Sequence, residues 1–183
     1  MDDLCKAMLL SIGATPTEPG RSWTVRIPGQ TLNYTPVYAS ELGIFVAVGI
    51  SGTILTSSDG VTWTTRTSGT ASQLNGVTWS GTQFVAVGFS GTILTSPDGI
   101  TWTTRTSGTA SQLNGVTWSG TQFVAVGTSG TIVTSPDGIT WTTRTSGTTN
   151  SLYGVTWTGT QFVAVGTSGT IVTSPDGITW TTR

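Results

Sequence analysis

The chain has 183 residues, of which only 8% are charged, and its formal net charge is −1. This balance gives no electrostatic footprint for nucleic acid or for an anionic membrane. The chain contains no His, the commonest general base and transition-metal ligand, and its single Cys5 cannot form an internal disulfide. No apolar run is long enough to span a membrane, and the first residues, "MDD", are acidic where an export signal is basic. We therefore expect no nucleic-acid binding, no membrane insertion, no metal and no cofactor.

Residues 1–20 lie outside the repeated part of the chain. The run "DDLCKAMLLSI" predicts about three turns of amphipathic helix, with Leu4, Met8 and Ile12 on one side. The stretch "GATPTEPG" that follows is typical of a linker. Three interpretations of this segment remain: a frayed tail, a docking peptide for a partner or sister subunit, and an uncleaved export signal. We predict a docking segment and linker at 1–20 and one β domain at 21–183.

The rest of the sequence repeats with a period of 39 residues. Each unit predicts four short β-strands; in one unit they are 76–80, 83–88, 92–96 and 100–106. The run "FVAVG" does not alternate, so this strand must be covered on both faces. Four strands in a period near 40 residues are the signature of a β-propeller blade. A β-solenoid usually has a shorter period, and a β-sandwich would not repeat its sequence so literally.

We therefore predict an all-β propeller of four-stranded antiparallel blades at about 34–66, 73–105, 112–144 and 151–183. Upstream, "SWTVR" resembles the last strand of a unit and predicts an extra strand at 22–27. A closed ring of four blades is uncommon, and an open arc would expose apolar sheet faces. We expect a homo-oligomer, with the extra strand either fastening the ring or pairing with another chain.

Each unit also contains "SPDG" or "SSDG" before a Thr-Trp pair. Pro presets the first central position of a type I turn, Asp suits the second, and Gly relieves the backbone that follows. We therefore assign a structural role in turns to Asp59, Asp98, Asp137 and Asp176. Equivalent positions in successive blades keep these carboxylates apart, whereas glycoside hydrolysis needs two carboxylates close together. We predict no catalytic residue and expect that the protein is not an enzyme.

The segment "SPDGITW" resembles the Asp-box, or BNR repeat, of sialidase-like propellers, which reads Ser-x-Asp-x-Gly-x-Thr-Trp. Here Gly follows Asp directly, a departure of one residue. The resemblance covers about residues 22–183 and implies a propeller in which the Asp-box is structural and lies away from any catalytic centre. The shortened form, with "GTQFVAVGTSGTIVTS", is similar to repeats of phage tail proteins and other bacterial and phage proteins. Photosystem II assembly factors of the Ycf48 type are also similar.

Two classes of function follow. The first is a structural or attachment component of a phage virion, such as a tail or decoration protein, that binds neighbouring virion proteins and host-surface glycans. The second is a multivalent lectin-like protein, located outside the cell or at its surface, with weak sites on equivalent blades. A bacterial assembly-factor scaffold is a further alternative.

The resemblance to phage tail repeats favours the virion component. Several apolar and aromatic side chains are candidates for ligand or partner contacts, although Trp residues in such repeats also pack between blades. Ile50 and Phe89 are included because the later units have Thr at the same position. The full set is Trp79, Trp118, Trp157, Ile50, Phe89, Leu4, Met8 and Ile12.

Overall fold

Four antiparallel sheets of four strands each contain most of the chain. The computed structural model describes residues 14–18, 22–25 and 35–183. Within each sheet the strands lie in chain order, so that every neighbouring pair of strands forms a hairpin. We refer to the four sheets as blades 1 to 4, in chain order.

The blades follow the 39-residue repeat of the sequence. Blade 1 contains β3 (Thr35–Ala39), β4 (Ile44–Val48), β5 (Ile54–Ser57) and β6 (Thr64–Arg66). Blade 2 contains β7 (Leu74–Trp79), β8 (Phe84–Gly88), β9 (Ile93–Ser96) and β10 (Thr103–Arg105). Blade 3 contains β11 (Leu113–Trp118), β12 (Phe123–Gly127), β13 (Ile132–Ser135) and β14 (Thr142–Arg144). Blade 4 contains β15 (Leu152–Trp157), β16 (Phe162–Gly166), β17 (Ile171–Ser174) and β18 (Thr181–Thr182).

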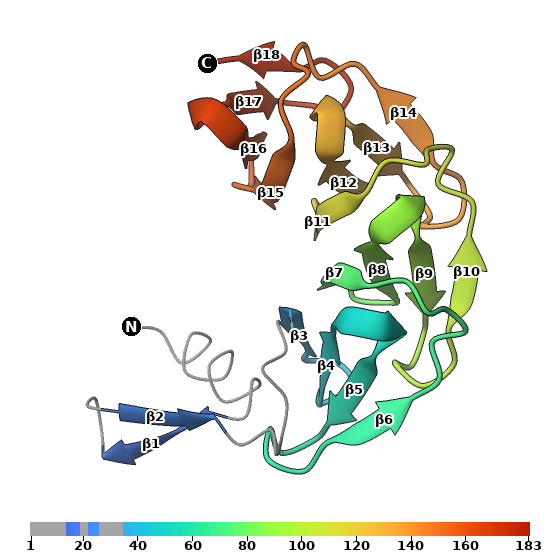
Figure 1. Ribbon diagram of the computed structural model, residues 1–183, viewed down its shortest axis with the longest axis vertical. Helices are drawn as coiled ribbons and strands as arrows, with labels where there is room; N and C mark the ends of the chain where they lie inside the picture. Colours follow the sequence, from blue (N-terminus) through green and yellow to red (C-terminus); the bar gives the residue numbers. More distant parts are fainter. Residues whose placement is uncertain (1–13, 19–21, 26–34) are drawn as a thin grey trace.

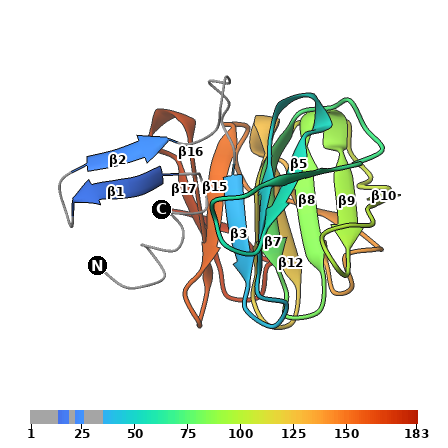
Figure 2. The ribbon, with the colours of Figure 1, turned by 90° about the horizontal axis from the view of Figure 1, so that it is seen from below.

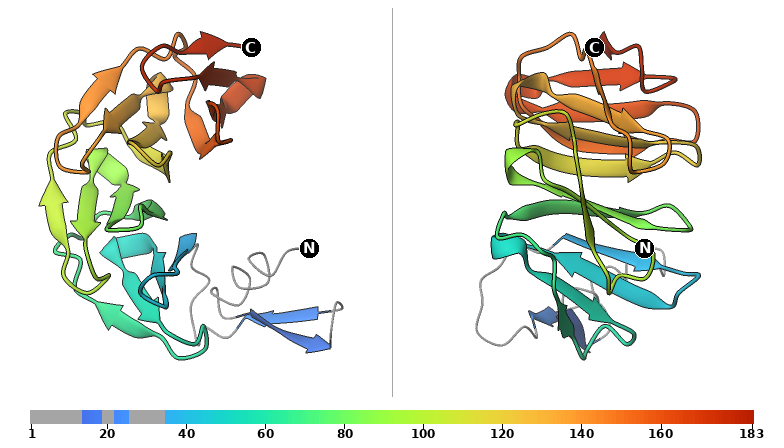
Figure 3. Two further views of the ribbon diagram at one scale, coloured as in Figure 1. Left: turned by 180° about the vertical axis from the view of Figure 1, so that it is seen from behind. Right: turned by 90° about the vertical axis from the view of Figure 1, so that its right-hand side faces the viewer.

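The blades stand side by side around a common centre and form an open arc of the β-propeller type (Figure 1). The first strand of each blade lies on the inside of the arc and the short fourth strand on the outside. Consecutive inner strands contact one another: β3 with β7, β7 with β11, and β11 with β15. Blades 1 and 4 lie at the two ends of the arc (Figure 3), and the view from below shows the blades standing next to each other (Figure 2). The sequence therefore predicted the blades correctly, and their arrangement is an arc and not a closed ring.

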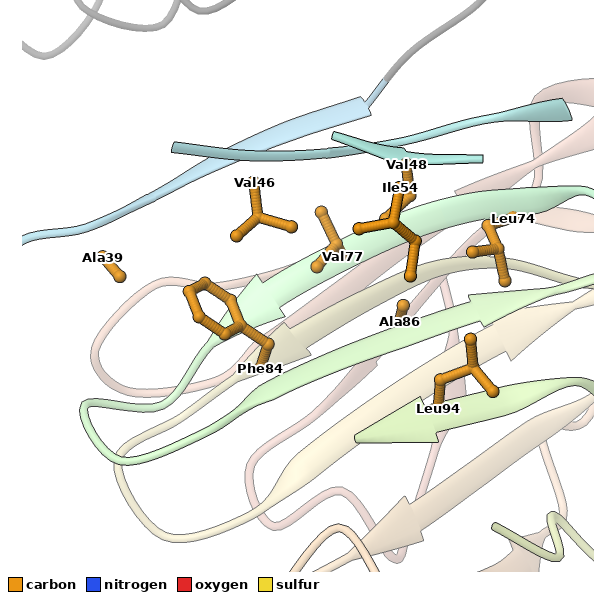
Figure 4. Packing of buried hydrophobic residues seen from close by; sticks show 9 residues of the cluster. All are labelled: Ala39, Val46, Val48, Ile54, Leu74, Val77, Phe84, Ala86 and Leu94. Carbon is orange, nitrogen blue, oxygen red and sulfur yellow. The ribbon is translucent and has the colours of Figure 1, made fainter. Parts of the chain in front are cut away.

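The second strand of each inner blade is buried on both faces, as its uninterrupted apolar sequence predicted. In blade 2, Phe84 and Ala86 lie in a hydrophobic cluster shared with blade 1 (Figure 4). The alternate residues Val85 and Val87 lie in the cluster shared with blade 3. All four side chains are 0% exposed, and burial of a Val or Phe side chain contributes roughly 1.5–3 kcal/mol. One strand thus stabilises two interfaces between blades.

A short 3₁₀ turn follows the second strand of every blade: η1 (Ile50–Gly52), η2 (Phe89–Gly91), η3 (Thr128–Gly130) and η4 (Thr167–Gly169). In blade 2 the turn places Gly91 at a positive φ of 67°, against the connector to blade 3. A Cβ atom at Gly91 would collide with the backbone carbonyl of Thr109 in that connector. Gly is therefore required where the backbones of successive blades approach each other.

The described N-terminal segments differ from the sequence prediction. Residues predicted as a linker form strand β1 (Ala14–Glu18), which pairs antiparallel with β2 (Ser22–Val25). The predicted extra strand is thus observed as β2, but its partner is β1 and not a blade. The β-branched Thr15 and Thr17 favour a strand. Leu4, Met8 and Ile12, on the predicted helix, lie outside the described residues.

The described residues contain no helix that is long and apolar enough to cross a membrane.

Candidate functional site

Each blade has one Asp in the turn between its third and fourth strands, and this Asp bonds to its own turn. In blade 2, Asp98 Oδ1 accepts the backbone N–H groups of Ile100 and Thr101, each at 2.8 Å. The Ser96 hydroxyl donates to the same oxygen at 3.0 Å and accepts the N–H of Gly99 at 2.8 Å. The same network occurs at Asp59, Asp137 and Asp176. In all four turns the carboxylate holds the backbone locally.

These hydrogen bonds favour the ionised carboxylate. The backbone N–H of Thr62 is the largest cause that lowers the pKa of Asp59 from 3.8 to about 2. The pKa values of the other three Asp residues are also lowered, and the largest cause in each is again the backbone N–H of the Thr three residues later. Among the described residues, no group of three or more His, Cys, Asp or Glu could hold a metal ion. The carboxylates are therefore separate fixed charges, one in each blade.

The repeated Arg near the end of each blade is also engaged within its own blade. In each case Nε donates at 2.9 Å to a Thr hydroxyl on the neighbouring third strand: Arg66 to Thr56, Arg105 to Thr95, Arg144 to Thr134 and Arg183 to Thr173. Arg66, Arg105 and Arg144 end the fourth strands β6, β10 and β14, which lie along the outer edge of the arc (Figure 1). Each of these guanidinium groups is therefore bonded within its own blade.

The candidate residues Trp79, Trp118 and Trp157 end the first strands of blades 2, 3 and 4 and lie at the same end of three successive blades. Each indole is half-buried and packs on the Phe that begins the next strand, with ring centroids 4.4, 4.4 and 4.5 Å apart. Trp79 Nε1 donates to Glu41 Oε2 of blade 1 at 2.7 Å. The pKa of Glu41 is lowered, first by its own backbone N–H and then by this bond. Within 35–183, the indole N–H groups of Trp118 and Trp157 have no acceptor.

The candidate residues Ile50 and Phe89 lie at the opposite end of the blades from the Trp residues, because they follow the antiparallel second strands. Phe89 is 41% exposed, and Ile50 is half-buried. The structure thus separates the two groups of candidate residues onto two different ends of the arc.

A cleft of about 380 Å³ lies between blades 1 and 2, at the end that carries the Asp turns. Its apolar lining comes from Leu42, Ile44 and Ile100, and Arg66 and Asp98 supply charges. Leu42 and Ile100 are 43% and 51% exposed. We call this feature the blade 1–2 cleft. None of its lining residues was a candidate for ligand or partner contacts on the sequence alone.

The blade 1–2 cleft lies where blade 1 departs from the repeat. In blades 2 and 3 the residue before the central Phe is Gln, and its Nε2 donates to a turn carbonyl of the next blade: Gln83 to Asp137 at 2.7 Å and Gln122 to Asp176 at 2.6 Å. Blade 1 has Ile44 at this position, which cannot donate this hydrogen bond. Blade 1 also has one extra residue in its first hairpin, where Leu42 lies. These two departures from the repeat were the signals in the sequence that could have indicated a cleft at blade 1.

The sheets, their order and their arc-like arrangement define a β-propeller protein. A scan against protein-family models found no match, and neither did a search of curated proteins. Among solved structures, the chain is similar to YCF48 bound to a D1 peptide, with a TM-score of 0.71 and 18% identity. This similarity covers 93% of the present chain and 59% of that chain.

Two other solved propellers are also similar. YCF48 from Cyanidioschyzon merolae has a TM-score of 0.66 and 20% identity over 85% of this chain and 57% of that chain. The β-propeller domain of Cps50 (Swd1) from Myceliophteria thermophila has a TM-score of 0.62 and 11% identity, over 88% and 55%. The present chain therefore spans less than two thirds of each of these structures. At such low identities the similarity establishes the fold alone.

Proposed function

We propose that the chain is a non-catalytic propeller module that binds a protein partner through the blade 1–2 cleft. The observation that carries this proposal is the break in the repeat at Ile44, which lines an apolar cleft between blades. A site on a repeat protein is expected where one unit differs from the others, because identical units offer no unique position. The four Asp carboxylates hold their own turns and lie in separate blades, which argues against paired-acid catalysis.

The lining of the cleft favours a peptide that combines an apolar side chain with a carboxylate. Leu42, Ile44 and Ile100 offer apolar surface to the side chain. Among the described residues, Arg66 uses only Nε in a hydrogen bond, so its terminal nitrogens are free for a carboxylate. A solved propeller of similar fold, YCF48, binds a D1 peptide, which supports the capacity of this fold for peptide binding.

A substitution that restores the repeat tests this proposal. Peptides that bind the full chain would be selected from an array of apolar sequences with acidic or free carboxyl ends, and their affinities measured by fluorescence polarisation. Ile44→Gln replaces part of the apolar lining with an amide that can donate to the turn of blade 2, and it should weaken binding by about tenfold or more, which corresponds to about 1.4 kcal/mol. The matched control is Gln83→Ile, which removes the equivalent hydrogen bond between blades 2 and 3 and should leave the affinity unchanged. Unchanged affinity in Ile44→Gln, or no peptide bound by the native chain, would contradict the proposal.

As the biological setting we propose a structural or attachment component of a phage particle, located in the virion. The support is the similarity of the shortened Asp-box-like turn, with "GTQFVAVGTSGTIVTS", to repeats of phage tail proteins, together with a low content of charged residues. Immunogold electron microscopy with an antibody against the chain should label phage particles from a lysate that contains the gene. Labelling confined to the supernatant after the particles are pelleted would exclude this setting.

Glycan binding is the second candidate function, and the indole N–H groups of Trp118 and Trp157, which have no acceptor in residues 35–183, favour it. Hydroxyl groups of the adjacent turns, such as Ser119 and Thr121, lie next to the indole in the sequence and bond to each other at 3.2 Å. A glycan array probed with the full chain tests this function. Trp118→Ala should abolish a true signal, and Trp79→Ala should weaken it less, because the Trp79 N–H already donates to Glu41. An array without signal would leave the protein partner as the proposed ligand.

A further inference from the structure

The outward side of blade 4 has the residues of an interface between blades but no neighbour among the described residues. We call it the terminal face and define it by Val163, Val165, Ile171 and Gln161. In blades 1 to 3 the residues equivalent to Val165 and Ile171 are all 0% exposed: Val48, Val87 and Val126, and Ile54, Ile93 and Ile132. In blade 4, Val165 is 46% and Ile171 is 41% exposed. The terminal face is therefore an apolar patch, and the equivalent side chains in blades 1 to 3 are fully buried.

Blade 4 also has the Gln side chain and the Gly that contact the next blade elsewhere in the chain, but here neither contacts another described blade. Gln83 and Gln122 each donate to a turn carbonyl of the following blade, whereas Gln161 is exposed and has no such acceptor within 35–183. A Cβ atom at Gly130 would collide with the connector to blade 4, whereas Gly169 of blade 4 has open space around it. The terminal face thus has the shape, the donor and the apolar side chains for another blade.

We propose that blade 1 of a second copy of this chain covers the terminal face, and that two copies joined head to tail close into one ring. The interface between blades 1 and 2 shows which side chains a second copy must place against the terminal face. In blade 2, Phe84, Ala86 and Leu94 cover Val46, Val48 and Ile54 of blade 1 (Figure 4). Blade 1 has Phe45, Ala47 and Leu55 at the same positions of its strands. A second copy therefore offers the matching face.

The shape of the arc fits this assembly. Blade 1 and blade 4 lie at opposite ends of the arc (Figure 1), so two copies related by a twofold axis would form two identical junctions and leave no free end. Phe45 and Ala47 are only 9% and 2% exposed, while Leu55 is half-buried. Assembly therefore requires Phe45 and Ala47 to exchange their present neighbours for Val163 and Val165.

The mass of the full chain in solution tests the proposal. Sedimentation or light scattering should give twice 18.9 kDa for the native chain. The double variant Val165→Lys, Ile171→Lys should give a single 18.9 kDa species, because charged side chains cannot be buried in the junction. Both residues are exposed, so the variant should keep its β circular dichroism signal. Ile178→Lys is the matched control; it adds charge at a side chain that is 51% exposed outside the terminal face and should stay dimeric.

A mixing experiment separates head-to-tail joining from a symmetric contact of two terminal faces. Leu55→Lys spoils the opposite side of the junction and should also be monomeric alone. Mixed with the Val165→Lys, Ile171→Lys variant, it should form a heterodimer, since each variant keeps one of the two surfaces intact. A native chain that stays monomeric at all concentrations, or a mixture that does not dimerise, would overturn the proposal. These results do not depend on the blade 1–2 cleft, so this proposal and the proposed function fail separately.

Discussion

At the scale of single residues, the charged groups of the repeat stabilise local structure. Ser96 is 0% exposed and supplies the acceptor for the buried N–H of Gly99. Asp98 then accepts the two N–H groups that follow. The sequence predicted the turn and its residues from their type and order. It did not show that Ser96 would be the buried member of the network, because the burial depends on the neighbouring blade.

Ser96 should contribute to stability because its hydroxyl accepts the hydrogen bond of the buried Gly99 N–H. Ser96→Ala leaves the Gly99 N–H without its acceptor, and we expect the free energy of unfolding to fall by about 1–3 kcal/mol. Urea denaturation followed by circular dichroism measures this change. Ser58→Ala is the control, because Ser58 is an exposed turn residue in blade 1 and its loss should cost less than about 0.5 kcal/mol. Equal effects of the two substitutions would contradict the role assigned to Ser96.

The lowered pKa values of the Asp residues predict a dependence of stability on pH. A folded-state pKa of about 2 for Asp59, below its ordinary value of 3.8, means that the unfolded chain binds protons first as pH falls. The stabilisation is therefore fully present above about pH 4 and is lost as pH falls towards about 2. Since the chain has no His, the free energy of unfolding should change little from pH 5 to 7. Urea titrations at a series of pH values from about 2 to 7 test the prediction. A loss of stability that falls mainly between pH 5 and 7 would contradict it.

At the scale of elements, the sequence predicted the four-stranded blades because β-branched strands alternate with Gly-rich turns. The run "FVAVG" indicated burial on both faces, and the structure confirms this for blades 1 to 3. The sequence did not predict β1, because a short Thr-rich stretch beside Pro and Gly is also typical of a linker. The blade 1–2 cleft was missed because the role of the Gln in other blades becomes visible only when its partner carbonyl is located.

Two Gly residues with similar backbone conformations separate the effect of strain from that of packing between blades. Gly91 and Gly108 have φ values of 67° and 75°, but only Gly91 faces a backbone carbonyl where a Cβ would lie. Gly108→Ala should cost about 1–2 kcal/mol from the left-handed backbone alone. Gly91→Ala should cost more, because the connector at Thr109 must move. Comparison of the two unfolding free energies measures the packing contribution, and equal values would refute the close approach of the blades.

At the scale of the whole molecule, the protein is an open four-bladed arc with two unlike ends. The sequence could not predict the opening of the ring, because the repeat fixes the contact between blades but does not state how many blades close a circle. The expectation of a homo-oligomer rested on the apolar faces that an arc exposes. The structure adds the residues of one such face, Val163, Val165 and Ile171, and thereby makes the expectation testable.

The central claim is that contacts between blades, repeated along the chain, also determine how the molecule assembles. Electron microscopy of the full chain tests it most directly, because projection images distinguish a ring from an arc. We expect closed rings with eight blades for the native chain and open arcs for the Val165→Lys, Ile171→Lys variant. Isolated arcs of the native chain, or blades arranged without rotation about a common axis, would contradict it.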